Sequence, residues 1–288
     1  MSLYISTTFA KDKTPVSNVL NLLNSFNIKN IELGSNHCWE KSIKNKLLKY
    51  PFNFLVHNYF PVPKKNIIIN IASSDYLIRK KSIKHIKNSI LFTKKINASL
   101  YTFHPGFIMD PISESKSKKN YDFKFKKFKK NEINYNNSFN SMIISLKEIV
   151  KFAKKEKVKI AIETEGSRKK NFYFLYHYDE YLRLYKIFNK NDFGLNLNLG
   201  HLNLASKCLG FDKLTFIKKL KKYIVAIEMS HNNGLKDEHL PLKKNAWYWT
   251  VLKDKYFKKA YKIMEFRNTS INQVLKNIKL FNEHSKKI

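Results

Sequence analysis

The sequence predicts an α/β fold, a single (β/α)8 barrel that spans residues 1–288 as one domain with a basic insertion after its fourth strand. The chain has 288 residues, and about 250 are typical of such barrels. Hydrophobic residues make up 43% of it, enough for a large core. Short β-branched or aromatic runs alternate with amphipathic stretches, and this alternation is typical of parallel strands joined by helical crossovers. An open doubly wound sheet is the weaker alternative, because no Gly-x-Gly-x-x-Gly follows a strand.

Eight runs have the composition of strands and alternate with helical patterns. The expected strands are Leu3–Ser6, Asn30–Gly34, Phe52–His57, Ser99–His104, Val158–Thr164, Phe193–Asn198, Tyr223–Ser230 and Ala260–Glu265. The expected helices are Pro15–Phe26, Tyr76–Ile96, Phe139–Glu156, Tyr178–Asn189, Leu214–Lys222 and Ile271–His284. In the last helix, the apolar residues recur at helical spacing and form one stripe that can pack on the barrel.

The segment Met109–Asn136, after the fourth strand, interrupts this alternation of strands and helices. Its core, Lys116–Lys130, is basic and contains interleaved aromatic residues: Tyr121, Phe123, Phe125 and Phe128. A segment at this place would overhang the mouth of the barrel, as a lid or as a surface for a nucleic-acid strand. The alternative is a solvated insertion whose aromatic residues pack on the rim.

The net charge of +33 is unusual, and 51 of the 55 basic residues are lysines. Such a charge favours anionic partners, including nucleic acid. An even spread of lysine beside abundant asparagine and isoleucine also fits a bias toward A/T-rich codons. Specific phosphate sites more often use the two-pronged guanidinium of arginine, of which the chain has only four.

We expect a cytoplasmic protein that has no membrane partner. No run of about 18 apolar residues is present, and the first residues lack the basic region of a secretory signal. Two cysteines, Cys38 and Cys208, are too few for a disulfide framework. The oligomeric state stays open, and a homo-oligomer is possible on these observations.

Residues of the kinds that bind metals stand at the predicted strand ends, where the chemistry of such barrels is found. They are His57, His104, Glu163, Asn198 with His201, Glu228 followed by Asp237 and His239, and Glu265. Converging buried carboxylates are costly unless something positive neutralises them. A divalent cation, Mn2+, Mg2+ or Zn2+, would do so, and an oxygen-dominated ligand set favours Mn2+ or Mg2+.

Strand parity supports this convergence, because side chains alternate between the two faces of a strand. Bulky apolar residues hold the parity opposite to that of Glu163, Asn198, Glu228 and Glu265. The polar residues are therefore expected to point into the barrel. His231 has the other parity and does not join them unless its strand has already ended.

Taken in chain order, these motifs resemble the xylose-isomerase-like TIM barrels. The resemblance rests on VHNYFP, NIIINIASS, FHPGF, Glu163, Asn198-x-x-His201, Asp237–His239 and Glu265. This superfamily contains sugar-phosphate isomerases and epimerases, and also the endonuclease IV type of apurinic-site endonuclease. The resemblance covers nearly the whole chain.

For an isomerase or epimerase of a sugar or sugar phosphate, the resemblance implies one Mn2+ or Mg2+ held by Glu163, Asn198, Glu228 and Glu265. Glu163 and Glu265 would also be the acid–base pair that moves a proton through a metal-stabilised enediolate. His201 would hold the substrate or stabilise its oxyanion. The family pattern has Asp at the place of Asn198 and usually His at that of Glu228.

The endonuclease alternative implies three Zn2+ ions and a nucleic-acid partner. It uses nine ligand positions, seven of which keep a residue of the family type: His57, His104, Glu163, His201, Asp237, His239 and Glu265. The stretch after His239 lacks the Gly-Glu-Gly turn of these endonucleases. A third alternative is a non-catalytic barrel that binds a polyanion through its lysines, and Asn198 is its main support.

Five residues are expected near a substrate. His57 and His104 stand at strand ends, Lys243 and Arg267 follow the seventh and eighth strands and could hold a phosphate or carboxylate, and Trp247 could stack on a sugar ring. The alternatives are a solvated surface position for Lys243 and Arg267, and core packing for Trp247 and its neighbour Trp249.

Overall fold

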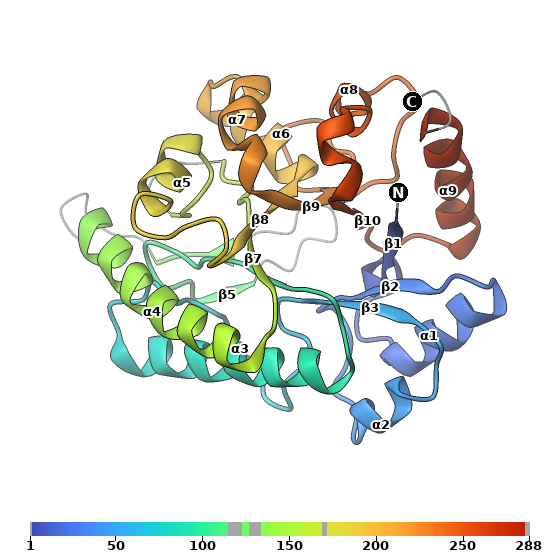
Figure 1. The fold of residues 1–288 in the computed structure, drawn as a ribbon, viewed down its shortest axis with the longest axis horizontal. Coiled ribbons are helices and arrows are strands. Elements are labelled where there is room, and N and C mark those ends of the chain that lie inside the picture. The colour runs from blue at the N-terminus through green and yellow to red at the C-terminus, as the bar shows by residue number, and fades with distance from the viewer. Residues whose placement is uncertain (1, 115–122, 127–133, 169–171, 286–288) are drawn as a thin grey trace.

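Eight parallel strands close into a barrel in the order β1-β10-β9-β8-β7-β4-β3-β2 (Figure 1). The computed structural model describes residues 2–114, 123–126, 134–168 and 172–285. The barrel strands are β1 (Leu3–Ser6), β2 (Asn30–Leu33), β3 (Asn53–His57), β4 (Tyr101–Phe103), β7 (Ile160–Glu163), β8 (Gly194–Asn198), β9 (Ile224–Met229) and β10 (Tyr261–Met264). The predicted (β/α)8 fold is confirmed.

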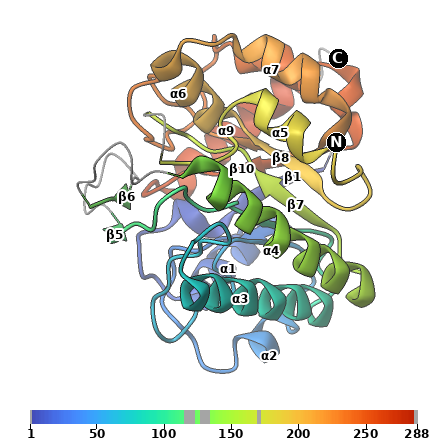
Figure 2. The same ribbon diagram turned by 90° about the vertical axis from the view of Figure 1, so that its left-hand side faces the viewer.

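Helices surround the barrel, and α3 and α4 lie side by side on one flank (Figures 1 and 2). Their bounds are α1 (Val16–Ser25), α2 (Ile43–Leu47), α3 (Tyr76–Lys95), α4 (Tyr135–Glu156), α5 (Tyr178–Leu184), α6 (Leu199–Leu209), α7 (Lys213–Leu220), α8 (Tyr248–Leu252) and α9 (Ile271–Ser285). Short 3-10 turns, η1, η3 and η4, cover Thr7–Phe9, Lys221–Tyr223 and Lys255–Lys259. None of the helices in the described part of the chain has the length and apolar character needed to cross a membrane.

Several element boundaries differ from the prediction. Helix α4 begins at Tyr135 rather than at Phe139, because the side chain of Asn134 caps it by accepting from the N–H of Asn137. Helix α5 ends at Leu184 rather than at Asn189. Strands β4 and β10 each end one residue early, so His104 and Glu265 directly follow their strands.

Helix α6 (Leu199–Leu209) was not predicted, because the alternating run LNLNL before it continues as a strand pattern. Both ends of the helix nevertheless carry capping signals. The side chain of Asn198 accepts from the N–H of His201 at the N-terminus, and Gly210 takes a left-handed conformation (φ 73°) at the C-terminus. Helices α2 and α8 are five residues each and are too short to show a periodic pattern.

The interior of the barrel has an apolar floor below a polar upper layer. The floor is one cluster of buried side chains: Tyr4, Leu55, Leu100, Ala161, Ala226 and Ile263. The residues between them along the strands face outward, and Ile162, for example, packs in the core beneath the helices. Because the floor is closed by side chains, the polar groups above it can be reached only from the mouth of the barrel.

The insertion after β4 contains a two-stranded antiparallel sheet, β5 (Ser113–Glu114) and β6 (Phe123–Lys124), at one side of the molecule (Figure 2). The ring of Phe123 lies 4.7 Å from that of Phe107, in the loop after β4. The ring of Phe125 lies 4.6 Å from that of Phe172, in the loop after β7. These two aromatic residues therefore pack on the rim. The predicted Tyr121 and Phe128 lie outside the described residues.

We expect Ile162→Ala to lower the free energy of unfolding by about 2–5 kcal/mol, because the side chain is fully buried and its loss leaves a cavity. Ile144→Ala on α4 is the matched control, since that side chain is 66% exposed; its effect should stay within about 0.5 kcal/mol. Urea unfolding of both variants measures the difference. Equal losses would contradict the packing described above.

Candidate metal centre

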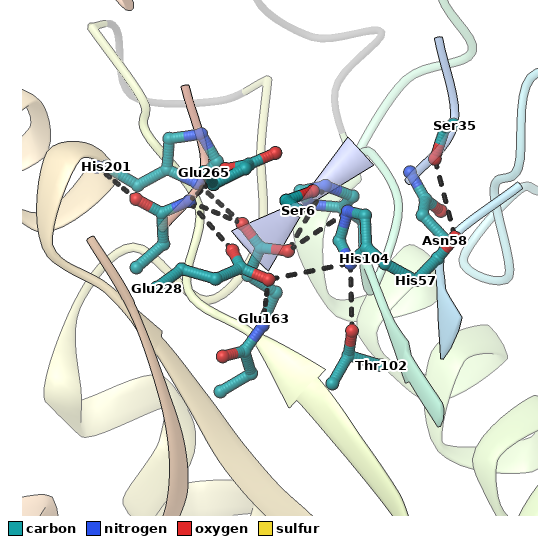
Figure 3. Close-up of polar contacts among 12 residues, drawn as sticks. Ser6, Ser35, His57, Asn58, Thr102, His104, Glu163, His201, Glu228 and Glu265 are labelled. Carbon is teal, nitrogen blue, oxygen red and sulfur yellow. Dashed lines mark hydrogen bonds and ion pairs between the residues drawn. The ribbon is translucent and has the colours of Figure 1, made fainter. Parts of the chain in front are cut away.

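Three glutamates from separate strands converge at the mouth of the barrel (Figure 3). Glu163 ends β7, Glu228 lies in β9 and Glu265 follows β10. Their exposed fractions are 1%, 0% and 3%, and each offers a carboxylate oxygen within 4.8 Å of the others. This spacing allows all three to bind a common ion. Without a compensating positive charge, such a group of buried carboxylates is unfavourable.

A first histidine set surrounds Oε2 of Glu163. Nε2 of His57 lies 3.6 Å from this oxygen and Nε2 of His104 lies 3.5 Å from it. The other ring nitrogens are held from behind, because Nδ1 of His57 lies 2.8 Å from Oγ1 of Thr102 and Nδ1 of His104 lies 2.9 Å from Oε1 of Glu165. Metal-binding histidines are oriented in this way. Among the described residues, Oε2 of Glu163 has no hydrogen-bond partner although it is buried, so the set fits a divalent cation.

A second set surrounds Oδ2 of Asp237. Nε2 of His239 lies 3.0 Å and Nε2 of His201 lies 3.5 Å from this oxygen. Nδ1 of His201 lies 2.8 Å from the carbonyl oxygen of Thr164, and Nδ1 of His239 lies 3.1 Å from Oε2 of Glu265. His239 is buried and holds a left-handed backbone conformation (φ 46°), which costs energy in a residue other than glycine. Two imidazoles and a carboxylate suit Zn2+ or another transition metal.

Between the two sets lies Asn198, the last residue of β8. Its Nδ2 donates to Glu163 Oε1 (2.9 Å), to Glu228 Oε2 (3.0 Å) and to Glu265 Oε2 (3.2 Å). Its Oδ1 accepts from the N–H of His201 (3.1 Å). The amide therefore presents hydrogen atoms, and not an oxygen, to the three glutamates. As placed, Asn198 does not fit the role of a metal ligand that the resemblance implies.

The histidines carry shifted pKa values. Burial lowers the pKa of His104, but the carboxylates of Glu163 and Glu165 raise it to about 9 overall. Burial likewise opposes protonation of His239, whose pKa rises to about 9 beside Asp237 and Glu265. Without a bound cation, these two imidazoles are therefore protonated at neutral pH and balance the carboxylates next to them.

The carboxyl groups divide into ionised and protonated members. Burial raises the pKa of Glu265, but His239 lowers it to about 2 overall. Burial raises the pKa of Glu228 well above its usual value, and the charges of Glu163 and Glu265 raise it further. Burial also lowers the pKa of His57 to about 4. The raised pKa of Glu228 favours its protonated form, and the lowered pKa of Glu265 favours its carboxylate form.

Glu32, in β2, belongs to this polar layer and was not predicted. It is fully buried, and ligand-type atoms of Glu32, His57 and Glu228 lie within 4.8 Å of one another. Burial, followed by the charge of Glu265, raises its pKa well above the usual value. Its inward parity within the predicted strand Asn30–Gly34 was the signal that would have found it. Thr102 and Glu165, which orient histidines, were not predicted as site residues either.

The residues predicted near a substrate lie at different places. The backbone N–H of Arg267 donates to the carbonyl of His239 (3.1 Å), so Arg267 directly adjoins the second histidine set. Lys243 is exposed, and its backbone N–H donates to the hydroxyl of Tyr248 (2.8 Å). His231 pairs with Leu240 in an antiparallel bridge beyond the end of β9.

The two tryptophans differ in their packing. Trp249 is buried and its ring stacks on His284 at 4.0 Å, so it belongs to the contact between α8 and α9. Trp247 is partly buried, and the ammonium of Lys213 lies 4.4 Å from the centre of its ring. A sugar that stacked on this face of Trp247 would have to displace Lys213.

The whole architecture matches one family model, described as xylose isomerase-like TIM barrel, over residues 24–283. The chain belongs to this family. It is 26% identical over 208 residues to an uncharacterized protein of Methanocaldococcus jannaschii, a match that covers 72% of this chain and 69% of that relative.

Several solved structures share the fold of this chain. A D-tagatose 3-epimerase-like protein has a TM-score of 0.76 and 19% identity, with 100% of this chain and 98% of that one covered. Endonuclease IV from Thermus thermophilus has a TM-score of 0.62 and 9% identity, with 100% of both chains covered. At these identities the likeness concerns the fold.

We expect the affinity for Zn2+ to rise with pH from about 6 to about 8, because the cation must displace protons from ligands. His104 and His239, with pKa values of about 9, hold protons in this range, and raising the pH removes this competition. Calorimetry in two buffers of different ionisation enthalpy counts the protons released. An affinity independent of pH, without proton release, would contradict the assigned protonation states.

We expect Glu165→Gln to weaken metal binding by about 10- to 100-fold, because the carboxylate that orients His104 becomes a neutral amide. The matched control is Glu114→Gln, since Glu114 is exposed in β5 and its substitution should leave the affinity unchanged. Competition with a chromophoric chelator measures both variants. The orienting role is wrong if the two variants bind equally well.

Proposed function

We propose that this protein is a metal-dependent isomerase or epimerase of a small hydroxylated molecule, a sugar or a sugar phosphate. The observation that carries the proposal is the convergence of the buried carboxyl groups of Glu163, Glu228 and Glu265 from three strands, next to two histidine sets that could hold a metal ion. The fold of the D-tagatose 3-epimerase-like protein, with a TM-score of 0.76, supports it. Membership of the family is compatible with it, although the family includes other activities.

The glutamates carry out the acid–base chemistry. Glu163 or Glu265, both with lowered pKa values despite burial, accepts the proton from the carbon next to the substrate carbonyl, which leaves an enediolate. The other glutamate of the pair Glu163 and Glu265, once it has taken a proton from Glu228, returns this proton to the opposite face and completes the epimerisation. Glu228, whose pKa is raised well above its usual value, holds a proton that can replenish this donor.

His57, His104 and Glu163 would hold a divalent cation in this mechanism. The cation would supply positive charge beside the substrate oxygens where negative charge develops. The set His201, Asp237 and His239 lies on the other side of the glutamates. His201, which the resemblance implies as a substrate contact, would there act through a second cation or directly by its imidazole.

The enclosure of the centre favours a small substrate. Glu163, Glu228, Glu265 and His239 are each at most 3% exposed, whereas the side chain of His104 is 22% exposed. Access therefore leads past His104. Phe123 packs on Phe107, three residues after His104, so the described part of the insertion lies close to this entrance.

One observation favours a second candidate function, a metal-dependent endonuclease at abasic sites. Two histidine-rich sets flank the glutamates, and ligands of this kind suit Zn2+. The net charge of +33 would also favour a nucleic-acid backbone. Against this function stand the burial of the centre and the lack of the Gly-Glu-Gly turn after His239.

The isomerase is tested by solvent deuterium exchange into a panel of ketoses and ketose phosphates, with Mn2+ or Zn2+ present. We expect deuterium at the carbon next to the carbonyl of the true substrate. Glu163→Gln and Glu265→Gln should each lower the exchange rate by about 10²- to 10⁴-fold, since each removes a proton-transfer group. Glu114→Gln, on the exposed β5, should leave the rate unchanged.

The same preparation is tested for incision of a duplex with one abasic site, at moderate salt. Incision that Glu163→Gln abolishes, together with no exchange over the whole panel, would overturn the isomerase in favour of the endonuclease. Absence of both activities from metal-loaded protein would refute both proposals for the substrates tested.

A further inference from the structure

The orientation of the Asn198 side chain is fixed at both ends. Its oxygen caps helix α6 by accepting from the N–H of His201 (3.1 Å). Its nitrogen donates into the space between Glu163 (2.9 Å), Glu228 (3.0 Å) and Glu265 (3.2 Å). The side chain is fully buried, so water cannot replace either end at little cost.

Rotating the amide of Asn198 by half a turn would break the hydrogen bonds at both its oxygen and its nitrogen. The oxygen would then face three carboxyl oxygens at about the distance of a hydrogen bond, without a hydrogen atom from the amide between them. The NH2 group would face the N–H of His201, and α6 would lose its cap. Asn198 therefore caps α6 through its oxygen and turns its NH2 group, which cannot bind a cation, toward the glutamates.

A carboxylate at this position would have no such conflict. An aspartate has two oxygens, so one could accept from the N–H of His201 while the other binds a cation. It would also add a negative charge to the buried group of Glu163, Glu228 and Glu265, and a cation would then be needed to balance it. The difference between the two side chains lies in one atom, the nitrogen that now faces the glutamates.

In the two histidine sets, the atoms that would bind a cation do not accept from the side-chain nitrogen of Asn198. In the set His57, His104 and Glu163, both imidazoles present Nε2 to Glu163 Oε2, at 3.6 and 3.5 Å. This is a different oxygen from Oε1, which accepts from Asn198. In the set around Asp237, His201 and His239 present Nε2 to Asp237 Oδ2, at 3.5 and 3.0 Å. Their Nδ1 atoms lie 3.1 Å from Glu163 Oε1 and Glu265 Oε2, the oxygens that accept from Asn198, and are not needed to bind the cation. Both sets can thus be occupied while the amide keeps its position.

We propose that the amide of Asn198 takes the place of a cation between Glu163, Glu228 and Glu265, so that this centre binds two divalent cations, one in each histidine set, and none between them. The proposal rests on the metal dependence of the proposed function and not on its reaction. It explains how three buried carboxyl groups can stay together: the amide and the flanking imidazoles give them hydrogen bonds and positive charge.

The test counts Zn2+ per chain by native mass spectrometry and elemental analysis, after dialysis of the full chain with Zn2+ and removal of the unbound metal. No substrate is present, so a failure of the isomerase activity would not affect the result. We expect two ions in the unaltered chain, one after His57→Ala or after His201→Ala, and none in the double variant. The double variant locates the ions even if no Asn198 variant folds.

Asn198→Asp should raise the count to three, because the aspartate can cap α6 and bind a cation together. Asn196→Asp is the matched control: Asn196 is also buried in β8 and donates to Glu228 (2.7 Å), but it does not cap a helix. Its count should stay at two. A count other than two in the unaltered chain, one ion retained by the double variant, or two ions in Asn198→Asp would each overturn the proposal.

Discussion

The constraint on which the rest of this structure depends is the neutralisation of like charges in a closed space. The barrel brings Glu163, Glu228 and Glu265 together with almost no exposure to water. Ionised carboxyl groups cannot share such a site without compensation. In this chain, three features act together: imidazoles lie beside the glutamates, the raised pKa of Glu228 favours its uncharged form, and the amide of Asn198 lies between all three. A metal ion would displace the protons from the histidines, so protons and metal ions compete for the same nitrogen atoms.

The barrel fixes the positions of these charged groups through rigid, local contacts. An apolar floor closes the barrel beneath the polar layer, and the register between strands sets the height of each polar side chain. Hydrogen bonds behind the rings then fix the histidines, as Thr102 does for His57 and Glu165 for His104. Such outer contacts turn residues that are merely near one another into an oriented ligand set. Because these contacts already hold the rings in place, little reorganisation is needed for metal binding.

Much of this could be predicted from the sequence, since strand composition and parity are local properties. The eight strands and the inward direction of the strand-end polar residues follow from a two-residue period. Helix α6 was missed because LNLNL continues the strand pattern into a helix whose caps are single residues. Glu32 was missed because it lies in the middle of its strand, whereas the prediction considered residues at strand ends, although its parity points it inward. The packing of Trp249 on His284 likewise joins segments 35 positions apart.

The sequence by itself determined the architecture, the family and the set of residues available for chemistry, because these depend on periodicity and on residue type. Only the tertiary structure decided which of those residues lie together in one ligand set. It separates the histidines into two sets around Glu163 and Asp237, and it points the nitrogen of Asn198 at the glutamates. The physical reason is that hydrogen-bond direction depends on atoms brought together from different strands. The side chain of Asn198 both caps α6 and donates to three glutamates that are distant in the sequence. No local sequence pattern shows both roles.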